Sequence, residues 1–347
     1  MSIEDLNPQY TPGMKAIKRC RDVYIGQAAI TKTSEGLTPY FPMFVPKNQD
    51  RYNRVIELSS FTNYTGHTVD KLVGAAFNED PKTNLEENQT LKYMLEDADG
   101  SGGDLKQVAT SVVRQNTIAG RIGLLVNYPS TGGETLSKEQ VKKLKLRASI
   151  HQYHAETIPN WGVKNGKLHY VVLLESKLEH PADMFNHDSK VGRRVYSIAK
   201  DGFCYQQFVL NGQEFALESN VLVSDFNGNG LDYIPFVICG SVDNTANVDK
   251  PPIGDMADVN IAHFQIAVEE SENLSVHGQL TLGVTSDLSV TDWKLANPDG
   301  MAVGANSGYL LGTSGGFHTA TIPESGALPA AKAVKVQELV ALGANLI

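Results

Sequence analysis

The strongest constraint on the fold is a repeat of apolar residues between residues 253 and 277. Five of them recur at spacings of four, four, three and four residues, which places them on one narrow stripe of an α-helix. They are Ile253, Ala257, Ile261, Phe264 and Val268. A stripe of this width is typical of helices that pack side by side along their length. We therefore expect one long helix here, begun by Pro251-Pro252 and packed against a second helix.

The chain before this helix predicts a mixture of helices and antiparallel strands, and hence an α+β fold. Helical periodicity covers residues 12–26, 51–77 and 104–120, and Asn63 and Gly66 predict a kink or a break in the second of these. Short apolar segments bounded by Gly, Asn, Asp or Pro predict strands. These segments are residues 122–128, 150–161, 168–175, 192–199, 203–210 and 233–239.

The chain after residue 277 predicts a small insert followed by another helix. Residues 279–325 are rich in glycine and strand-prone, and Pro329 opens a helical segment that reaches Ile347. A helix that stops in an apolar run without a cap leaves carbonyl groups and hydrophobic surface exposed. We therefore expect the chain to be a truncated piece of a longer protein. The alternative is a helix that ends against a partner subunit.

The distribution of charge excludes one class of function for the last part of the chain. The formal net charge is −9, from 30 Lys and Arg against 39 Asp and Glu. Residues 252–347 hold three lysines, no arginine and ten acids, which leaves −7 of the −9 in this part. A surface that grips nucleic acid needs Lys and Arg to displace counterions from phosphates. This part is therefore either a solvated acidic face or a surface that must not hold DNA.

The remaining bulk properties indicate a folded protein of two or three compact parts. Its 347 residues are 41% hydrophobic and 20% charged, which is ordinary for a globular chain. The sequence predicts no membrane span and no signal peptide, so we expect the protein in a cytoplasm or in a particle assembled there. Cys20, Cys204 and Cys239 are widely spaced and odd in number, which favours buried thiols over a disulfide framework or a zinc site.

No motif nominates a catalytic residue, a metal ligand or a cofactor, so we expect no enzyme. The acidic segment from Asp97 to Asp104 resembles a calcium loop, but Val108 stands where a bidentate glutamate is needed. We interpret it as a turn in which Asp104 caps the following helix. His151 and His154 lie three residues apart on a predicted strand and therefore point to opposite faces.

Several strings, in the same order along the chain, resemble a portal-like family of tailed bacteriophages that carries a domain-of-unknown-function heading. The strings begin at Arg51-Tyr52 and continue with Asn63-Tyr-Thr-Gly-His-Thr-Val-Asp70, Leu72-Val-Gly-Ala-Ala-Phe77, Asp97-Ala-Asp-Gly-Ser-Gly102, Ala119-Gly-Arg-Ile-Gly-Leu-Leu-Val-Asn-Tyr-Pro129, Ala155-Glu-Thr-Ile-Pro-Asn-Trp161, Ile234-Pro-Phe236, Lys250-Pro-Pro-Ile-Gly-Asp-Met-Ala-Asp-Val-Asn-Ile-Ala-His-Phe264 and Leu342-Gly-Ala-Asn-Leu346. Their succession is more specific than any one of them.

The resemblance implies a portal protein, one subunit of the ring through which viral DNA enters and leaves a capsid. It implies a mixed α/β wing at residues 1–250, a first stem helix at 251–278, an inserted α/β clip at 279–326 and a second stem helix at 327–347. It also implies a homo-dodecamer at the portal vertex of a virion, assembled in the host cytoplasm. The implied partners are the major capsid protein, the terminase motor and the head–tail adaptor. Double-stranded DNA would pass through without specific binding, and no membrane is involved.

The resemblance also suggests where the acids of the long helix lie. An acidic channel wall repels the duplex and lets it slide, whereas each contact between a phosphate and a Lys or Arg adds affinity. We therefore expect some of the helix acids to face the channel. The candidates are Asp255, Asp258, Glu269, Glu270 and Glu272. Two alternatives stay open: another ring-forming head–tail adaptor of the virion, and a calcium-assisted hydrolase.

Overall fold

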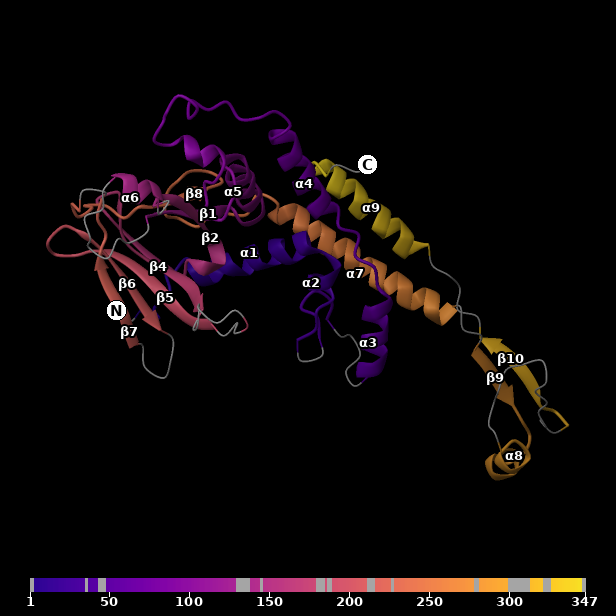
Figure 1. Cartoon of the computed structure of the whole chain (residues 1–347). Coiled ribbons are helices and arrows are strands. Elements are labelled where there is room, and N and C mark those ends of the chain that lie inside the picture. The colour runs from indigo at the N-terminus through magenta and orange to yellow at the C-terminus, as the bar shows by residue number, and fades with distance from the viewer. Residues whose placement is uncertain are drawn as a thin grey trace. The chain divides into compact units, whose positions relative to one another are not determined.

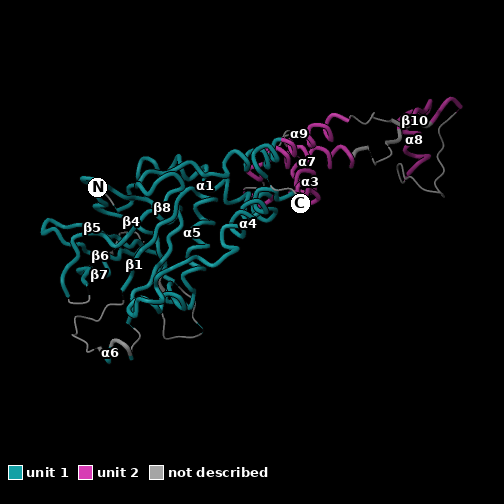
Figure 2. The backbone as a smooth tube through the Cα atoms, turned by 90° about the horizontal axis from the view of Figure 1, so that it is seen from above, with its two compact units in different colours: residues 1–30, 62–261, 338–347 teal, residues 31–61, 262–337 magenta. Residues whose placement is uncertain are grey.

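The chain folds into antiparallel β-sheets and long helices, so the predicted α+β fold class is confirmed (Figure 1). The computed structural model describes residues 3–34, 37–42, 48–128, 138–143, 146–178, 185, 189–210, 216–225, 228–277, 281–298, 313–320 and 326–344. The chain divides into two compact units (Figure 2). Unit 1 comprises residues 1–30, 62–261 and 338–347, and unit 2 comprises residues 31–61 and 262–337.

Unit 1 contains a three-stranded antiparallel sheet in which the first strand along the chain is central. The strand order is β2-β1-β8, with β1 at Arg121–Asn127, β2 at Ser149–His154 and β8 at Phe236–Gly240. Gly123 of β1 is the position where a side chain would not fit. A Cβ atom there would overlap Cζ of Phe236 and would lie 2.9 Å from Cδ1 of Ile158. Glycine therefore lets the neighbouring aromatic ring close over the strand.

Unit 1 also contains a five-stranded antiparallel sheet in simple meander order. Its strands are β3 (Asn160–Lys164), β4 (Lys167–Leu178), β5 (Ser189–Ile198), β6 (Cys204–Leu210) and β7 (Ala216–Leu222). Asn165 and Gly166 join β3 to β4 with φ angles of 54° and 75°. Two successive positive φ angles match the twist of the flanking strands, which is why Asn-Gly is favoured in such hairpins.

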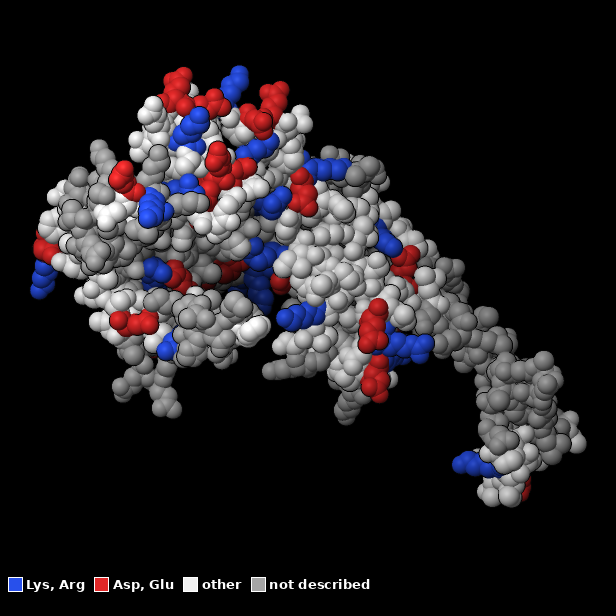
Figure 3. All heavy atoms as spheres, in the orientation of Figure 1, with Lys and Arg blue, Asp and Glu red and all other residues white. Residues whose placement is uncertain are grey.

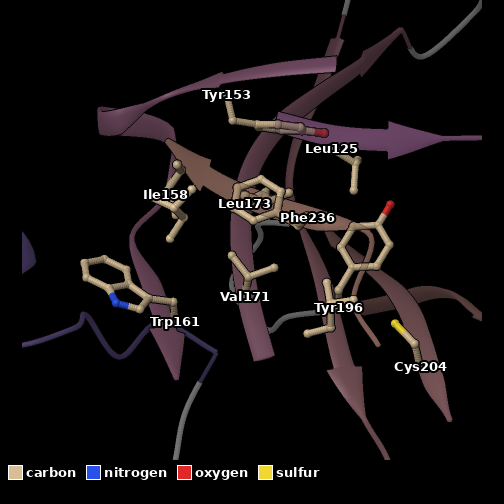
Figure 4. Close-up of a cluster of buried hydrophobic side chains, with 11 residues drawn as sticks. Leu125, Tyr153, Ile158, Trp161, Val171, Leu173, Tyr196, Cys204 and Phe236 are labelled. Carbon is tan, nitrogen blue, oxygen red and sulfur yellow. The ribbon is translucent and has the colours of Figure 1, made fainter. Parts of the chain in front are cut away.

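The two sheets pack face to face and enclose the main hydrophobic core (Figure 4). Leu125, Tyr153 and Phe236 come from the three-stranded sheet, and Val171 and Tyr196 come from the five-stranded sheet. The rings of Tyr153 and Phe236 meet edge to face, with centroids 6.0 Å apart. Alternate residues of each strand therefore supply the apolar layer between the sheets.

A buried polar network also links the two sheets. Glu175 of β4 accepts hydrogen bonds from Nε of Arg194 at 2.8 Å and from the hydroxyl of Tyr153. The guanidinium and carboxylate side chains are only 20% and 17% exposed. Burial and the adjacent Glu175 carboxylate raise the pKa of Tyr153. The tyrosine therefore stays a neutral donor, and the arginine supplies the charge that balances the carboxylate.

The strand assignments from sequence need two corrections. Residues 150–161, expected as one strand, are two strands in different sheets, because the 3-10 turn Ala155–Thr157 separates β2 from β3. β7 was not expected at all. Its sequence, Ala216-Leu-Glu-Ser-Asn-Val-Leu222, lacks strict alternation, and its register against β6 shifts between Phe208 and Val209. A bulged strand disrupts the period-two pattern on which strand assignment rests.

Two helices of unit 1, α4 (Tyr64–Ala76) and α5 (Leu105–Ala119), begin at side-chain caps that the sequence supplies, Asn63 and Asp104. Unit 1 also contains α1 (Tyr10–Ile25), α2 (Gln27–Ile30) and α6 (Lys138–Lys143), with a 3-10 turn at Lys92–Leu95. Asp104 accepts a hydrogen bond from Gln107 N at 2.7 Å, and the Gln107 side chain accepts one from Asp104 N. This capping box confirms the predicted N-cap, and Gly120 ends the helix in the left-handed region.

Unit 2 is built from α3 (Gln49–Leu58), the C-terminal part of α7 (Gly254–His277), the hairpin of β9 (Thr281–Thr285) and β10 (Gly316–Ala320), α8 (Val290–Ala296) and most of α9 (Ala327–Ala341). The expected break in residues 51–77 is present, since α3 ends at Leu58 and α4 begins at Tyr64. Tyr52 anchors α3, because its hydroxyl donates to Phe41 O at 2.8 Å. α9 runs back alongside α7 (Figure 1).

The end of α9 corrects the expectation of an uncapped helix that runs to Ile347. Gly343, with φ at 90°, follows the helix in the left-handed region. Its N–H donates to Val340 O at 2.9 Å, and Ala344 N–H donates to Leu339 O at 2.9 Å. These two bonds define a Schellman cap, and the accompanying apolar contact joins Ala344 to Leu339. The glycine was visible in the sequence, but the apolar residues around it suggested a continuing helix.

Gly343→Ala is expected to lower the free energy of unfolding by about 1 kcal/mol, because an L side chain is strained at this backbone conformation. Chemical denaturation with a circular dichroism readout measures the change. Gly326→Ala is the matched control, because a Cβ there meets nothing within 4 Å and the φ angle is not positive. Equal stability of the two variants would contradict a structural role for the cap.

Candidate functional site

The five acids proposed from sequence lie on α7, whose buried surface is broader than the predicted stripe. The predicted apolar stripe is confirmed, since Ile253, Ala257, Ile261, Phe264 and Val268 are each at most 9% exposed. Met256, Ala267 and two polar residues, Asn260 and His263, are buried as well. The helix is therefore covered on more than one side, and its acids are confined to the remaining surface.

In unit 1, two of the acids form ion pairs with cations from elsewhere in the chain. Asp258 Oδ1 lies 2.8 Å from Arg19 Nε of α1, and Asp255 Oδ1 lies 2.7 Å from Lys250 Nζ. The side chains of these pairs are between 40% and 70% exposed. Ion pairs at such exposure add little stability, but they cancel the local charge.

In unit 2, two more of the acids are paired. Glu270 Oε2 lies 2.8 Å from Lys332 Nζ of α9, and Glu272 Oε1 lies 2.6 Å from an Nη of Arg51 in α3. Glu270 is the most buried of the four paired acids, with a side chain that is 22% exposed. Its ion pair with Lys332 therefore fixes the position of α9 along α7 in unit 2.

Glu269 differs from the other four candidates. Its side chain is partly exposed, and among the residues that the structure describes no cation forms an ion pair with it. It is the candidate whose charge stays uncompensated within the described part of the chain. The prediction that these acids face a channel therefore rests mainly on Glu269.

The ion pairs change the interpretation of the charge distribution. The sequence count assigned −7 to residues 252–347, but Arg19, Arg51 and Lys250 precede this part and neutralise three of its acids. Figure 3 accordingly shows basic and acidic side chains interspersed on the face that it draws. The Arg19–Asp258 pair joins residues 239 positions apart, so periodicity and spacing could not have revealed it.

Next to these ion pairs, Asn260 ties α7 to the start of α4. Its Oδ1 accepts hydrogen bonds from Thr65 N at 3.1 Å and from Thr65 Oγ1 at 3.0 Å, and its Nδ2 donates to Thr62 O at 2.9 Å. Asn260 and Thr65 are both completely buried. Two of the strings that carry the family resemblance, residues 63–70 and 250–264, therefore meet in unit 1 at Thr65 and Asn260.

Cys20 lies in α1 beside Arg19 and is fully buried. Burial raises the pKa of its thiol to about 11, with smaller opposing effects of Arg19 and Asp258. The nucleophilic thiolate is therefore scarce at neutral pH. Cys204 is buried in the core between the sheets, and burial raises the pKa of its thiol to about 11 as well.

The calcium-loop candidate turns its carboxylates toward its own backbone. Asp99 Oδ1 accepts hydrogen bonds from Ser101 N at 2.7 Å and Gly103 N at 2.9 Å, and Asp97 Oδ1 accepts one from Gly102 N at 3.0 Å. The backbone hydrogen bond from Gly102 and the ion pair with Arg147 hold the pKa of Asp97 below its usual value. These contacts stabilise the turn before α5, as the N-cap interpretation predicted.

The histidine candidates are also placed apart. His151 and His154 belong to β2, where His151 Nε2 lies 3.0 Å from Ser149 Oγ and burial lowers the pKa of His154. Among the described residues, no group of three or more His, Cys, Asp or Glu side chains is placed to hold a metal ion. None of the helices that the structure describes has the length and apolar character needed to cross a membrane.

No protein-family model matches the chain, and no curated protein matches it. Similar solved structures are components of gene transfer agent (GTA) particles. A chain from the neck of an empty GTA particle, computed with C6 symmetry, is 11% identical, with 88% of this chain and 73% of that chain covered and a TM-score of 0.42. A chain from the virion of the native particle is 12% identical, with 88% and 72% covered and a TM-score of 0.41. A chain from the native neck, computed with C12 symmetry, is 12% identical, with 87% and 69% covered and a TM-score of 0.40.

Proposed function

We propose that this chain is a portal protein of a tailed phage or a phage-like particle, and that it acts as a structural component rather than as an enzyme. The observation that carries the proposal is the order helix, hairpin module, helix. α7 and α9 run side by side, and residues 278–326 between them hold the β9–β10 hairpin and α8. The ordered succession of family-like strings supports the same assignment.

In this proposal, residues 1–250 form the wing, 251–278 the first stem helix, 279–326 the clip and 327–347 the second stem helix. Twelve copies would form a ring at one vertex of a capsid. The ring would conduct double-stranded DNA during packaging and ejection and join head to tail. The capsid protein, the terminase motor and the adaptor would bind its outer parts.

The small hairpin module supports assembly into a ring. Val290 and Leu295 of α8 are 73% and 75% exposed. No apolar residue of this module is buried among those whose side chains the structure describes. A two-stranded hairpin is marginally stable alone. Contact with neighbouring copies would bury these side chains and stabilise the module.

The mass and symmetry of the purified protein test the proposal. Native mass spectrometry with negative-stain images is expected to give rings of about twelve subunits with a central hole. A protein that stays a monomer or a dimer at high concentration would contradict the proposed ring. A ring that binds the tail side of a virion but not the terminase motor would favour the head–tail adaptor.

Leu295→Glu is expected to reduce the fraction of protein in rings by about tenfold or more, because a charge replaces an apolar contact. Native mass spectrometry at matched concentration measures this fraction. Thr291→Glu adds the same charge to α8 without removing an apolar side chain and serves as the control. Equal ring fractions for the two variants would exclude Leu295 from the contact.

Glu269→Lys tests the channel-facing position. If Glu269 lines the channel, the variant ring carries a circle of lysines there. We expect it to bind a duplex of about 30 base pairs at about 50 mM salt at least tenfold more tightly than the unmodified ring does. Fluorescence anisotropy measures the affinity. Glu86→Lys, the same charge change at an exposed position of unit 1, is the control, and equal affinities would contradict the channel position.

A further inference from the structure

His263 is a titratable side chain in the interior of unit 2. It lies on α7 and is 2% exposed. Phe264 beside it is completely buried and meets the ring of Phe61 edge to face, with centroids 5.8 Å apart. The imidazole of His263 is buried in the interior of unit 2, where its neutral form is favoured over its cation.

Among the residues that the structure describes, Glu270 of α7 and Lys332 of α9 are the charged groups that act on His263. Glu270 follows two helical turns later on the same face of α7, and it forms the 2.8 Å ion pair with Lys332 of α9. The Arg51–Glu272 pair lies further along α7. Burial lowers the pKa of His263, Lys332 lowers it further, and Glu270 opposes them. Because Glu270 is already paired with Lys332, it balances little of an added charge.

We propose that His263 makes the packing of α7 against α9 in unit 2 sensitive to acid. The neutral imidazole permits residues 262–277 and 327–337 to pack together, whereas protonation places a second cation in the interior near Lys332. Acid therefore loosens this part of the helix pair before the rest of the chain. The device does not depend on the portal assignment.

The lowered pKa of His263 in the packed state means that acid weakens the packing of α7 against α9. In the opened state the imidazole titrates near its ordinary value of about 6.5, and in the packed state it titrates lower. The opened state therefore binds the proton more tightly. The packed state is fully favoured above about pH 6.5 and loses stability as the pH falls toward the lowered value. Between pH 7.5 and pH 5.5 the equilibrium constant for opening rises by up to about tenfold.

Hydrogen exchange followed by mass spectrometry tests this with the full chain. Protection factors, corrected for the intrinsic pH dependence of exchange, are compared at about pH 7.5 and about pH 5.5. Peptides from residues 262–277 and 327–337 are expected to lose up to about tenfold in protection. Peptides from β2, which holds His154, report separately on unit 1.

Three variants make the result decisive. His263→Gln is expected to lose less than about twofold in protection over the same interval, because it cannot take up the proton. His67→Gln, at an exposed position of α4, is expected to behave as the unmodified chain. Lys332→Gln removes the nearby cation, so its loss is expected to be smaller than that of the unmodified chain. An equal acid response of His263→Gln and the unmodified chain would overturn the proposal. If His263→Gln does not fold, an equal response of Lys332→Gln and the unmodified chain would do so.

Discussion

Glu175→Leu is expected to lower the free energy of unfolding of unit 1 by about 3–5 kcal/mol, because it leaves a buried cation without its carboxylate. Arg194 is 20% exposed and donates from Nε to both carboxylate oxygens at 2.8 Å. Tyr153, which burial holds in its neutral form, would lose the acceptor for its hydroxyl at the same time. The loss therefore combines an unpaired charge with an unpaired hydroxyl group.

Tryptophan fluorescence in urea measures this loss. The chain has two tryptophans, and Trp161 belongs to the core between the sheets. A Trp293→Phe background therefore makes the signal report on that core. The double variant Glu175→Leu/Arg194→Leu removes both charges and is expected to be more stable than Glu175→Leu alone. If Glu175→Leu lowers the free energy of unfolding by less than about 1 kcal/mol, the Glu175–Arg194 pair contributes no more than an exposed ion pair does.

Asn260→Ala is expected to cost about 2–4 kcal/mol, because it leaves a buried backbone N–H and a buried hydroxyl without their acceptor. Both groups belong to Thr65, whereas Thr62 C=O keeps its hydrogen bond from Tyr64 N–H. The methyl group that remains also leaves a small cavity beside α7. The cost is therefore larger than that of an ordinary surface hydrogen bond.

Urea denaturation with the same fluorescence probe measures the cost of Asn260→Ala. The first turn of α4 should in addition exchange its amide hydrogens faster, since Asn260 holds its start. Thr65→Ser keeps the backbone N–H and the hydroxyl and is expected to lose less than about 1.5 kcal/mol. A loss for Asn260→Ala no greater than that for Thr65→Ser would mean that the amide does not fix the contact.

Local pattern was enough to predict the longer helices, because their signals lie within a few residues, but it did not predict α8 in the strand-prone insert. The stripe on α7, the break before Tyr64 and the cap at Asp104 are all encoded in spacing and in single polar residues. Strand pairing is less local. The turn at Ala155–Thr157 moves the chain from one sheet to the other, and nothing in its composition distinguishes it from a continuing strand.

The candidate acids show why charge counted along the sequence is a weak guide to charge in space. The spacing of Asp255 and Lys250 is short enough to suggest a pair, whereas the partners of Asp258, Glu270 and Glu272 are 239, 62 and 221 positions away. Such pairs depend on how distant segments pack. Sequence could therefore nominate the acids but not separate Glu269 from the other four.

The five-stranded sheet can be extended by another strand along one side more readily than along the other. Beside β3, Asn7 N–H donates to Pro159 O at 3.0 Å, Asn7 Nδ2 donates to Trp161 O at 3.0 Å, and Asn160 Nδ2 donates to Asp5 O. Residues 5–7 therefore occupy the start of that edge, whereas β7 pairs only with β6 among the described strands. Endless edge-to-edge growth requires an accepting edge on both sides of each copy. Copies that meet through β7 would therefore form a closed pair of two chains rather than an open series.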